Sequence, residues 1–198
     1  MVYKIAHLFR DRLPALWQLI EIINSFIFSI RYGRRLRQIK PIVSKESYRI
    51  IPISEIPAEI LVDFFARQPL EAYTFFKPHG FDTKSIQRLQ GNKAFLAYVL
   101  MDDMAKRIAG YCFIRAFFHG RGFRGRIVDI DYRGRGLGAH MNRVLNDIGF
   151  GIGLRLFETV NKNNQASFRS SVSSSDIRIL DELEGGDLLL EILPFSNR

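Results

Sequence analysis

The chain has 198 residues, of which 47% are hydrophobic and 25% are charged. These proportions exclude a long disordered or fibrous protein and fit one compact domain with an appendage. The net charge is +9, and residues 1–40 hold eight of the 29 Lys and Arg residues but only two of the 20 Asp and Glu residues. Most of the excess positive charge therefore belongs to the N-terminal segment, and we expect no nucleic-acid partner. The single Cys112 excludes an intramolecular disulfide and a cysteine zinc cluster, which fits a cytoplasmic protein.

The N-terminal segment is predicted to contain an amphipathic helix. Residues 13–30 are strongly apolar, but the run is short and contains Glu21, so we do not expect it to span a membrane. On a helix, one narrow strip is polar: Gln18, Glu21, Ser25 and Ser29. The other side is apolar: Leu16, Trp17, Ile20, Ile23, Ile27 and Ile30. Four arginines follow, at positions 31, 34, 35 and 37, a pattern typical of a helix that rests on an anionic membrane surface, with Trp17 and the phenylalanines in the acyl boundary. The alternative is a helix that packs on its own domain or on a second subunit.

We expect this arm to cover residues 1–40, to end at Pro41, and to be followed by one domain over residues 41–198. Strands are predicted at residues 48–53, 94–101, 107–118, 126–131, 154–160 and 187–193. Helices are predicted from Pro57 to residue 65, from an N-cap at Asp82 to residue 89, from residue 137 to 150, and from Asn164 onward. Residues 94–118 suggest a hairpin, in which Gly110 marks a bulge or a close backbone approach. This order predicts an α+β or mixed α/β sheet flanked by helices.

A glycine-rich turn, residues 131–138, is predicted between a strand and a helix. The helix is supported by a stripe of apolar residues: Leu137, Met141, Val144, Leu145 and Ile148. Glycines let the backbone approach a ligand closely, and the start of a helix favours phosphate. No Lys-Ser or Lys-Thr pair follows these glycines as in a P-loop, and the turn comes too late to open a Rossmann unit. A purely structural turn is the alternative to a diphosphate site.

The order Arg133-x-x-Gly136-x-Gly138 at this turn resembles the acetyl-CoA pyrophosphate motif of the GNAT superfamily of N-acetyltransferases. The resemblance covers roughly residues 48–193 and is specific between about residues 127 and 171. It implies a mostly antiparallel sheet in which the strand ending at Asp131 splays from the strand starting at Leu154. The pantetheine arm of acetyl-CoA is then expected in the gap. The implied cofactor-binding residues are Ile130, Arg133, Gly134, Arg135, Gly136, Leu137, Gly138, Asn164 and Ser167, and no metal is expected.

Acetyl transfer to an amine needs a proton acceptor, because an amine that resembles lysine has a pKa of about 10.4. We rank Asp129 first, since it is predicted on the strand that GNAT enzymes use for such groups, followed by His79 and Glu158. The alternative for both carboxylates is an ion pair with arginine. Many GNAT proteins place a Tyr seven residues after the helix Asn as a general acid, but this chain has Ser170 and Ser171 there. The usual Gly-Phe is replaced by residues 173–176, so the acceptor wall is expected to differ.

Three further features have two interpretations each. The aromatic loop with Tyr73, Phe75, Phe76 and Phe81 either anchors the first two helices or forms a stacking wall for a sugar or a base. The basic turn at residues 119–126 either binds RNA or anionic lipid or is a solvated hairpin tip. Cys112, between two aromatic residues of a strand, is expected in the core rather than as a nucleophile.

The sequence thus predicts an acetyl-CoA-dependent N-acetyltransferase, as a monomer or homodimer, acting on a small-molecule amine. An amino sugar on a nucleotide or lipid carrier, in surface-polysaccharide synthesis, fits an enzyme held at the inner face of the plasma membrane. A protein or peptide amine is a second acceptor, and a non-catalytic CoA-binding, membrane-associated module is a third hypothesis.

Overall fold

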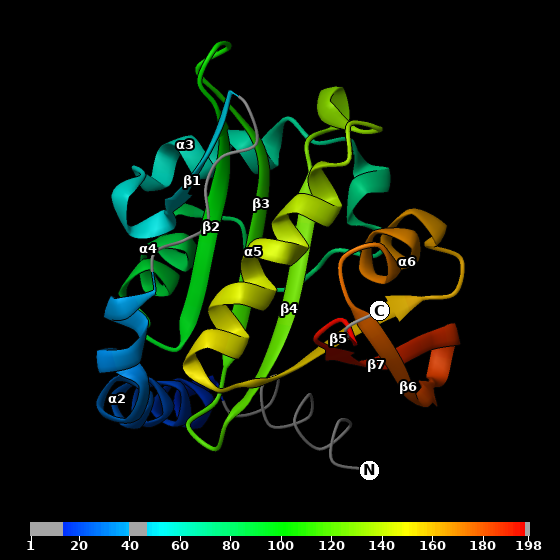
Figure 1. The fold of residues 1–198 in the computed structure, drawn as a ribbon. Coiled ribbons are helices and arrows are strands. Elements are labelled where there is room, and N and C mark those ends of the chain that lie inside the picture. The colour runs from blue at the N-terminus through cyan, green and yellow to red at the C-terminus, as the bar shows by residue number, and fades with distance from the viewer. Residues whose placement is uncertain (1–13, 40–46, 197–198) are drawn as a thin grey trace.

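The computed structural model describes residues 14–39 and 47–196. These residues form one seven-stranded sheet with helices on both of its faces (Figure 1). The strands are β1 (Tyr48–Pro52), β2 (Phe95–Asp102), β3 (Arg107–Ala116), β4 (Arg121–Val128), β5 (Arg155–Asn161), β6 (Asp176–Leu183) and β7 (Asp187–Leu193). The α-helices are α2 (Pro14–Gln38), α3 (Ala58–Ala66), α4 (Thr83–Gly91), α5 (Leu137–Ile152) and α6 (Gln165–Val172). Short 3-10 turns are η1 (Ile53–Glu55), η2 (Leu70–Tyr73), η3 (Ile130–Tyr132) and η4 (Glu184–Gly186).

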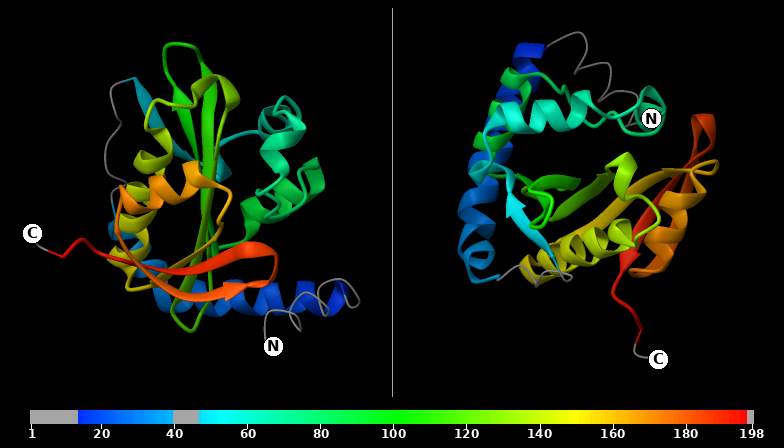
Figure 2. Two further views of the ribbon diagram at one scale, coloured as in Figure 1. Left: turned by 90° about the vertical axis from the view of Figure 1, so that its right-hand side faces the viewer. Right: turned by 90° about the horizontal axis from the view of Figure 1, so that it is seen from above.

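The strand order is β1-β2-β3-β4-β5-β7-β6, and every neighbouring pair is antiparallel except β4 and β5. Figure 2 shows α3 and α4 on one face of the sheet and α5 and α6 on the other. The expected mostly antiparallel α+β sheet is therefore confirmed.

Local signals predicted several elements well. Pro57 precedes α3, and Asp82 caps α4 by accepting a hydrogen bond from the backbone N–H of Ser85 at 3.0 Å. The stripe expected on α5 is buried along its whole length. Gly110 meets both expectations, because the β2–β3 register shifts beside it and a Cβ there would lie 2.9 Å from the Met141 side chain. Cys112 is buried in the core.

Two strands differ from the prediction. β4 starts at Arg121 rather than at residue 126 and ends at Val128, so most of the basic run expected as a hairpin tip or a nucleic-acid or lipid contact is a strand. The turn itself is short, closed by a hydrogen bond from the N–H of Gly120 to the carbonyl of Phe117. β6 was not predicted, because it is an edge strand whose residues are mostly exposed and it has little hydrophobic alternation.

α2 is the least expected part of the fold. It packs through Phe28 and Tyr32, which are 1% and 3% exposed, against the same core cluster as α5. The expectation that the phenylalanines reach a membrane is therefore wrong for Phe28, whereas Phe26 is 65% exposed. The expected end at Pro41 lies outside the described residues. No helix within residues 14–39 and 47–196 is long and apolar enough to cross a membrane.

Candidate active site

The loop between η3 and α5 has the backbone geometry of an anion cradle. Gly134 and Gly136 adopt left-handed conformations, with φ of +77° and +74°, and Gly136 directly precedes the first turn of α5. Such conformations are favourable for glycine and costly for other residues. Because the first N–H groups of a helix have no partner inside the helix, the start of α5 offers donors and a partial positive charge to an anion.

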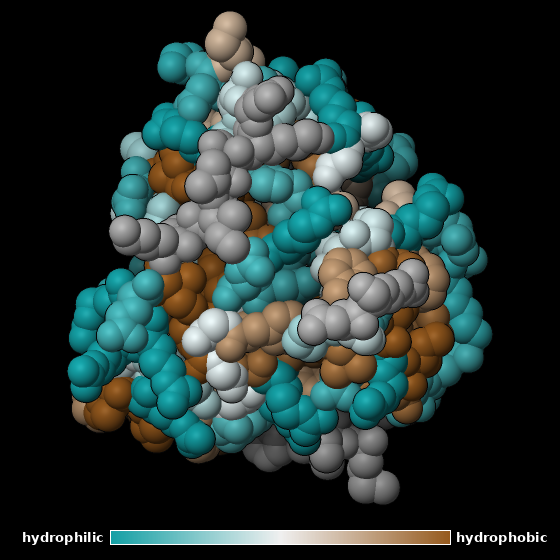
Figure 3. Space-filling model, viewed as in Figure 1, coloured by the Kyte–Doolittle hydropathy of each residue, from teal (hydrophilic) through white to brown (hydrophobic). Residues whose placement is uncertain are grey.

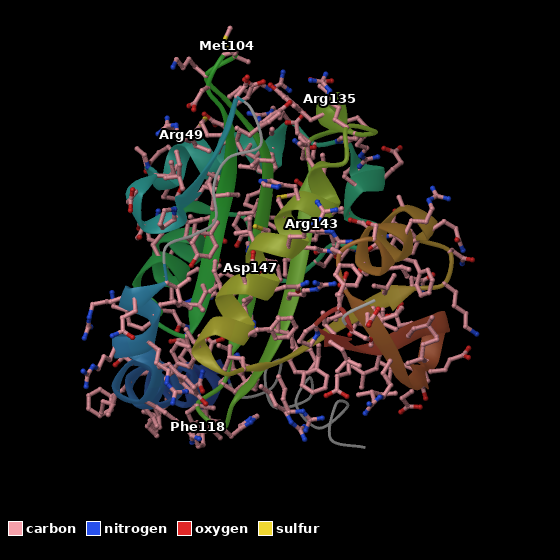
Figure 4. The ribbon with its side chains drawn as sticks, viewed as in Figure 1. Arg49, Met104, Phe118, Arg135, Arg143 and Asp147 are labelled. Carbon is pink, nitrogen blue, oxygen red and sulfur yellow. The ribbon has the colours of Figure 1, made fainter. Side chains whose placement is uncertain are left out.

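Side-chain contacts stabilise the conformation of this loop. The Tyr132 hydroxyl donates a hydrogen bond to Asp102 at the end of β2, at 3.0 Å. Arg135 donates to the Asp131 carbonyl at 3.0 Å and lies over the Tyr132 ring, so its cation is partly used within the loop. Arg133 is exposed at the C-terminal end of η3. Figure 4 shows Arg135 at the end of the molecule opposite Phe118. Both arginines of the loop are exposed, and Arg135 is the one with contacts inside the loop.

The first turn of α5 lies close to α6. A Cβ on Gly138 would lie 2.8 Å from the Ser170 hydroxyl oxygen, so a side chain at position 138 would force Ser170 to shift. Within the described residues, that buried hydroxyl oxygen has no hydrogen-bond partner. Asn164 caps α6 by accepting a hydrogen bond from the N–H of Ser167 at 3.1 Å. Asn164 and Ser167 therefore shape the start of α6, and a role in cofactor binding stays a prediction for them, as it does for Ile130.

β4 and β5 diverge, as the resemblance implied. They pair only from Arg121 to Phe123 on β4 and from Arg155 to Phe157 on β5. Across the described part of the chain, β4 has no second ladder partner beyond Phe123. Backbone N–H and C=O groups need partners when they are buried, so this edge of β4 can bind an extended ligand. The gap opens toward the same end of the sheet as the glycine loop (Figure 1).

A buried ion network fills the closed end of this gap. Glu158 on β5 accepts hydrogen bonds from Arg124 at 2.8 Å and from Arg126 at 2.7 Å, both on β4. The Ser171 hydroxyl donates to Glu158 at 2.9 Å. Burial alone would raise the pKa of Glu158, but the charges of Arg126 and Arg124 outweigh burial and lower that pKa to about 2. Glu158 is thus a permanent anion at neutral pH and bridges two strands that no longer pair.

Asp129 is also held by cations. The sequence pattern predicted Asp129 on a strand, but the residue lies after β4. It caps η3 by accepting a hydrogen bond from the N–H of Asp131. Its side chain is fully buried and accepts hydrogen bonds from Arg67 and Gln68, each at 2.9 Å, while Arg107 lies 3.2 Å away. Burial would raise the pKa of Asp129, but these hydrogen bonds prevail and lower it. The contacts favour a positioning role at the entrance to the glycine loop over proton transfer.

His79 lies on the opposite face of the sheet, among aromatic rings of α3, β2 and β3. Its Nε2 atom is 2.9 Å from the Tyr111 hydroxyl, and its ring contacts Phe65 and Phe81 edge-on. Burial lowers the pKa of His79, and the charge of Arg115 adds to this effect. A hydrogen bond to the Gly80 carbonyl acts in the opposite direction, and the resulting pKa is about 4. His79 is therefore neutral at pH 7.

The aromatic loop mainly anchors α3 and α4. Phe81 stacks on Phe65 at 4.4 Å between ring centroids, and Tyr73 and Phe76 contact Phe81. Phe75 is 48% exposed, and the other three rings are half-buried, so Phe75 is the ring of the loop most open to solvent. The structure thus separates the three candidate bases, with Glu158 on the α5 and α6 face, His79 on the α3 and α4 face, and Asp129 at the loop between them.

Sequence reasoning missed the arginines that hold the two carboxylates. Arg124 and Arg126 alternate with Gly125, which indicates one face of a strand, but the neighbouring glycines suggested a turn. Arg67 and Gln68 follow α3 and carried no sequence signal. Within the described residues, no group of three or more His, Cys, Asp or Glu side chains could hold a metal ion.

No family model matches the chain, and no curated protein matches its sequence. Solved structures do match. The ribosomal-protein-S5-alanine acetyltransferase from Vibrio fischeri has a TM-score of 0.61 and 16% identity, over 75% of this chain and 93% of that chain. The GNAT domain of PAT from S. lividans has a TM-score of 0.63 and 15% identity, over 73% and 89%. An aminoglycoside acetyltransferase solved with coenzyme A and kanamycin has a TM-score of 0.56 and 11% identity, over 75% and 95%. The chain therefore has the fold of the GNAT acetyltransferases.

Proposed function

We propose that the chain is an acetyl-CoA-dependent N-acetyltransferase that acts on a primary amine. The observation that carries the proposal is the pair of left-handed glycines at the start of α5, beside the gap where β4 and β5 stop pairing. A diphosphate and an extended arm need these two features side by side. The similarity to acetyltransferase structures, one of them solved with coenzyme A, supports the same reading.

The residues present fit this cosubstrate. Gly134, Gly136 and Gly138 allow a close backbone approach, Arg133 supplies an exposed cation, and the Ser170 hydroxyl is an unsatisfied polar atom beside Gly138. The unpaired edge of β4 would hold the arm. Acetyl-CoA supplies an acetyl thioester, whose carbonyl carbon the amine attacks while CoA leaves as the thiol.

The three candidate bases have different roles in this proposal. Asp129 and Glu158 act as positioning residues, because each is held by two guanidinium groups and has a lowered pKa. His79 borders the acceptor and is a neutral hydrogen-bonding group, since its pKa is about 4. A group with so low a pKa is a weak base, so we expect water to carry the amine proton away.

An amino sugar on a nucleotide or lipid carrier, used in surface-polysaccharide synthesis on the cytoplasmic side of the plasma membrane, is the proposed acceptor. The similar aminoglycoside acetyltransferase, solved in complex with kanamycin, supports a small-molecule acceptor of this kind. Protein amines are the second candidate, since another protein of similar structure is named a ribosomal-protein-S5-alanine acetyltransferase. A CoA-binding module without catalysis is the third.

Acetyl-CoA binding is tested by titration calorimetry with Arg133→Glu. Reversing this charge is expected to raise the Kd for acetyl-CoA at least tenfold, or about 1.4 kcal/mol, because a cation next to the diphosphate becomes an anion. Arg88→Glu, an equal charge change on α4, is the control and should leave the Kd unchanged. An unchanged Kd for Arg133→Glu would show that the phosphate assignment is wrong.

Activity is tested by release of the CoA thiol with amino-sugar nucleotides, aminoglycosides, polyamines and peptides. Turnover with one amino sugar supports the proposed acceptor, and turnover only with peptides favours the second candidate. Acetyl-CoA binding without turnover on any of these, or on lipid-linked amino sugars tested afterwards, favours the non-catalytic module.

A further inference from the structure

Three polar side chains of α2, Glu21, Asn24 and Ser25, contact the rest of the protein. The Asn24 side chain donates a hydrogen bond to the Ala116 carbonyl and accepts one from the N–H of Phe118, both at 2.9 Å. The Ser25 hydroxyl accepts a hydrogen bond from the N–H of Lys93 at 2.8 Å. Glu21 pairs with Arg115 at 3.4 Å. These polar contacts, together with the buried rings of Phe28 and Tyr32, dock the helix at the end of the sheet where β2 begins and β3 ends.

The apolar side of α2 faces outward as a consequence. We call this surface the outer face. Its members are 42% to 69% exposed: Leu16, Leu19, Ile20, Ile22, Ile23, Phe26 and Ile30. Burying such side chains is favourable, and a contiguous apolar patch of this kind is typical of an interaction site. In Figure 3, the part of the surface over α2, at the lower left, combines hydrophobic and hydrophilic areas.

Cations continue the outer face toward the end of the helix. Arg34 and Arg37 follow Phe26 and Ile30 on the same side of α2, and both are exposed. α2 contains one carboxylate, Glu21, and that group is already paired inward with Arg115. An apolar stripe that ends in arginines matches the acyl chains and the anionic headgroups of a membrane surface.

A second copy of the chain fits this surface less well. Two such helices packed in antiparallel fashion would place Arg34 and Arg37 of one copy against the apolar start of the other. Since the outer face has no carboxylate, nothing there would neutralise these arginines. We therefore propose that the outer face of α2 binds the surface of an anionic lipid bilayer, with α2 lying in the plane of the interface.

This arrangement fixes the orientation of the enzyme. α2 and the neighbouring Phe118 lie at one end of the molecule, and the glycine loop, with Arg135, lies at the other (Figures 1 and 4). When α2 rests on lipid, the loop points to the aqueous side, where a soluble diphosphate ligand has access. The membrane contact itself depends only on α2, so it holds whatever the acceptor is.

The test is co-sedimentation of the full chain with vesicles of phosphatidylcholine alone or mixed with phosphatidylglycerol. We expect sedimentation with the anionic vesicles, at least tenfold weaker binding to neutral ones, and partial release by salt. The double variant Ile22→Glu/Phe26→Glu changes only exposed side chains and should weaken binding at least tenfold. Met104→Glu, at the opposite end of the molecule and 83% exposed, is the control and should bind like the unmodified chain.

Acetyl-CoA affinity measured on the same samples shows that each variant is folded and separates this inference from the proposed function. No binding of the unmodified chain to anionic vesicles would overturn the inference, as would undiminished binding of the double variant. A dimer in light scattering that the double variant dissociates, without vesicle binding, would assign the outer face to a second copy instead.

Discussion

The two faces of the sheet bury polar groups in different ways. Under α5 and α6, Glu158 is buried as an anion between Arg124 and Arg126, whose side chains are 0% and 6% exposed. Under α3 and α4, His79 is a half-buried, neutral ring among aromatic side chains. The stability of the face under α5 and α6 depends on a full set of ionic partners for Glu158. The stability of the face under α3 and α4 depends on His79 remaining uncharged. Acid disturbs both faces, but in different pH ranges, which makes them separable by experiment.

The largest effect is expected for Glu158→Gln. Removing this charge leaves two buried guanidinium groups without their anion, which costs about 3–5 kcal/mol of unfolding free energy. The pKa of Glu158 falls from 4.5 in the unfolded chain to about 2 in the fold, so its stabilisation is complete above pH 4.5 and is lost as the pH falls toward 2. The variant should lack this acid-dependent loss, as measured by urea unfolding between pH 2 and 7.

Glu191→Gln is the matched control for that experiment. Glu191 is also buried, but its partners Arg155 and Arg178 are 62% and 64% exposed and can be solvated by water. We expect a cost of at most about 1 kcal/mol. Equal costs for the two variants would contradict the importance of buried partners on the face under α5 and α6.

An intermediate effect is expected for Asp129→Asn, which lies between the two faces. Loss of the charge weakens the hydrogen bonds from Arg67 and Gln68, at a cost of about 1–3 kcal/mol. The cost should stay below that of Glu158→Gln, because the side chains of Arg67 and Arg107 are 32% and 37% exposed and can turn to solvent. Since Asp129 caps η3, acetyl-CoA affinity should fall as well, by calorimetry. A stability loss with unchanged affinity would show that Asp129 does not position the glycine loop.

At neutral pH, the smallest effect among the three candidate bases is expected for His79→Gln. The glutamine keeps a polar group near Tyr111, so the cost at pH 7 should be about 1 kcal/mol. The pKa of His79 is about 4 in the fold and 6.5 in the unfolded chain. The unfolded state therefore binds a proton first, and the unmodified chain loses stability as the pH falls from 6.5 to 4. The variant should lose less over this range in urea unfolding. A parallel loss would assign the titration to other groups.

Local signals in the sequence predicted much of the fold. Pro57, Asp82 and Asn164 mark helix starts by their own chemistry, and the glycines at 134 and 136 mark a loop with left-handed backbone. The candidate site was located from the same kind of signal. These features need only neighbours within a few residues, so a single sequence contains them.

Partnerships between distant residues could not be read in the same way. Arg124 and Arg126 contact Glu158, which is 34 and 32 positions away in the sequence. No feature of the neighbouring residues distinguishes a buried ion network from a basic turn. The helical periodicity of α2 showed that its two sides differ, but not which side packs. The polar contacts of α2 are made with Ala116, Phe118 and Lys93, which only the tertiary fold brings close.

The distance along the chain between α2 and its docking site has a consequence for synthesis. Asn24 bonds to residues that are made 92 and 94 positions later. At about 5–20 residues per second, a ribosome needs roughly 5–20 s to produce them. During that time α2 has no folded surface to dock on, and its apolar side is accessible. We expect a nascent chain to be at its most dependent on a chaperone or a bilayer in this interval, before β3 is complete.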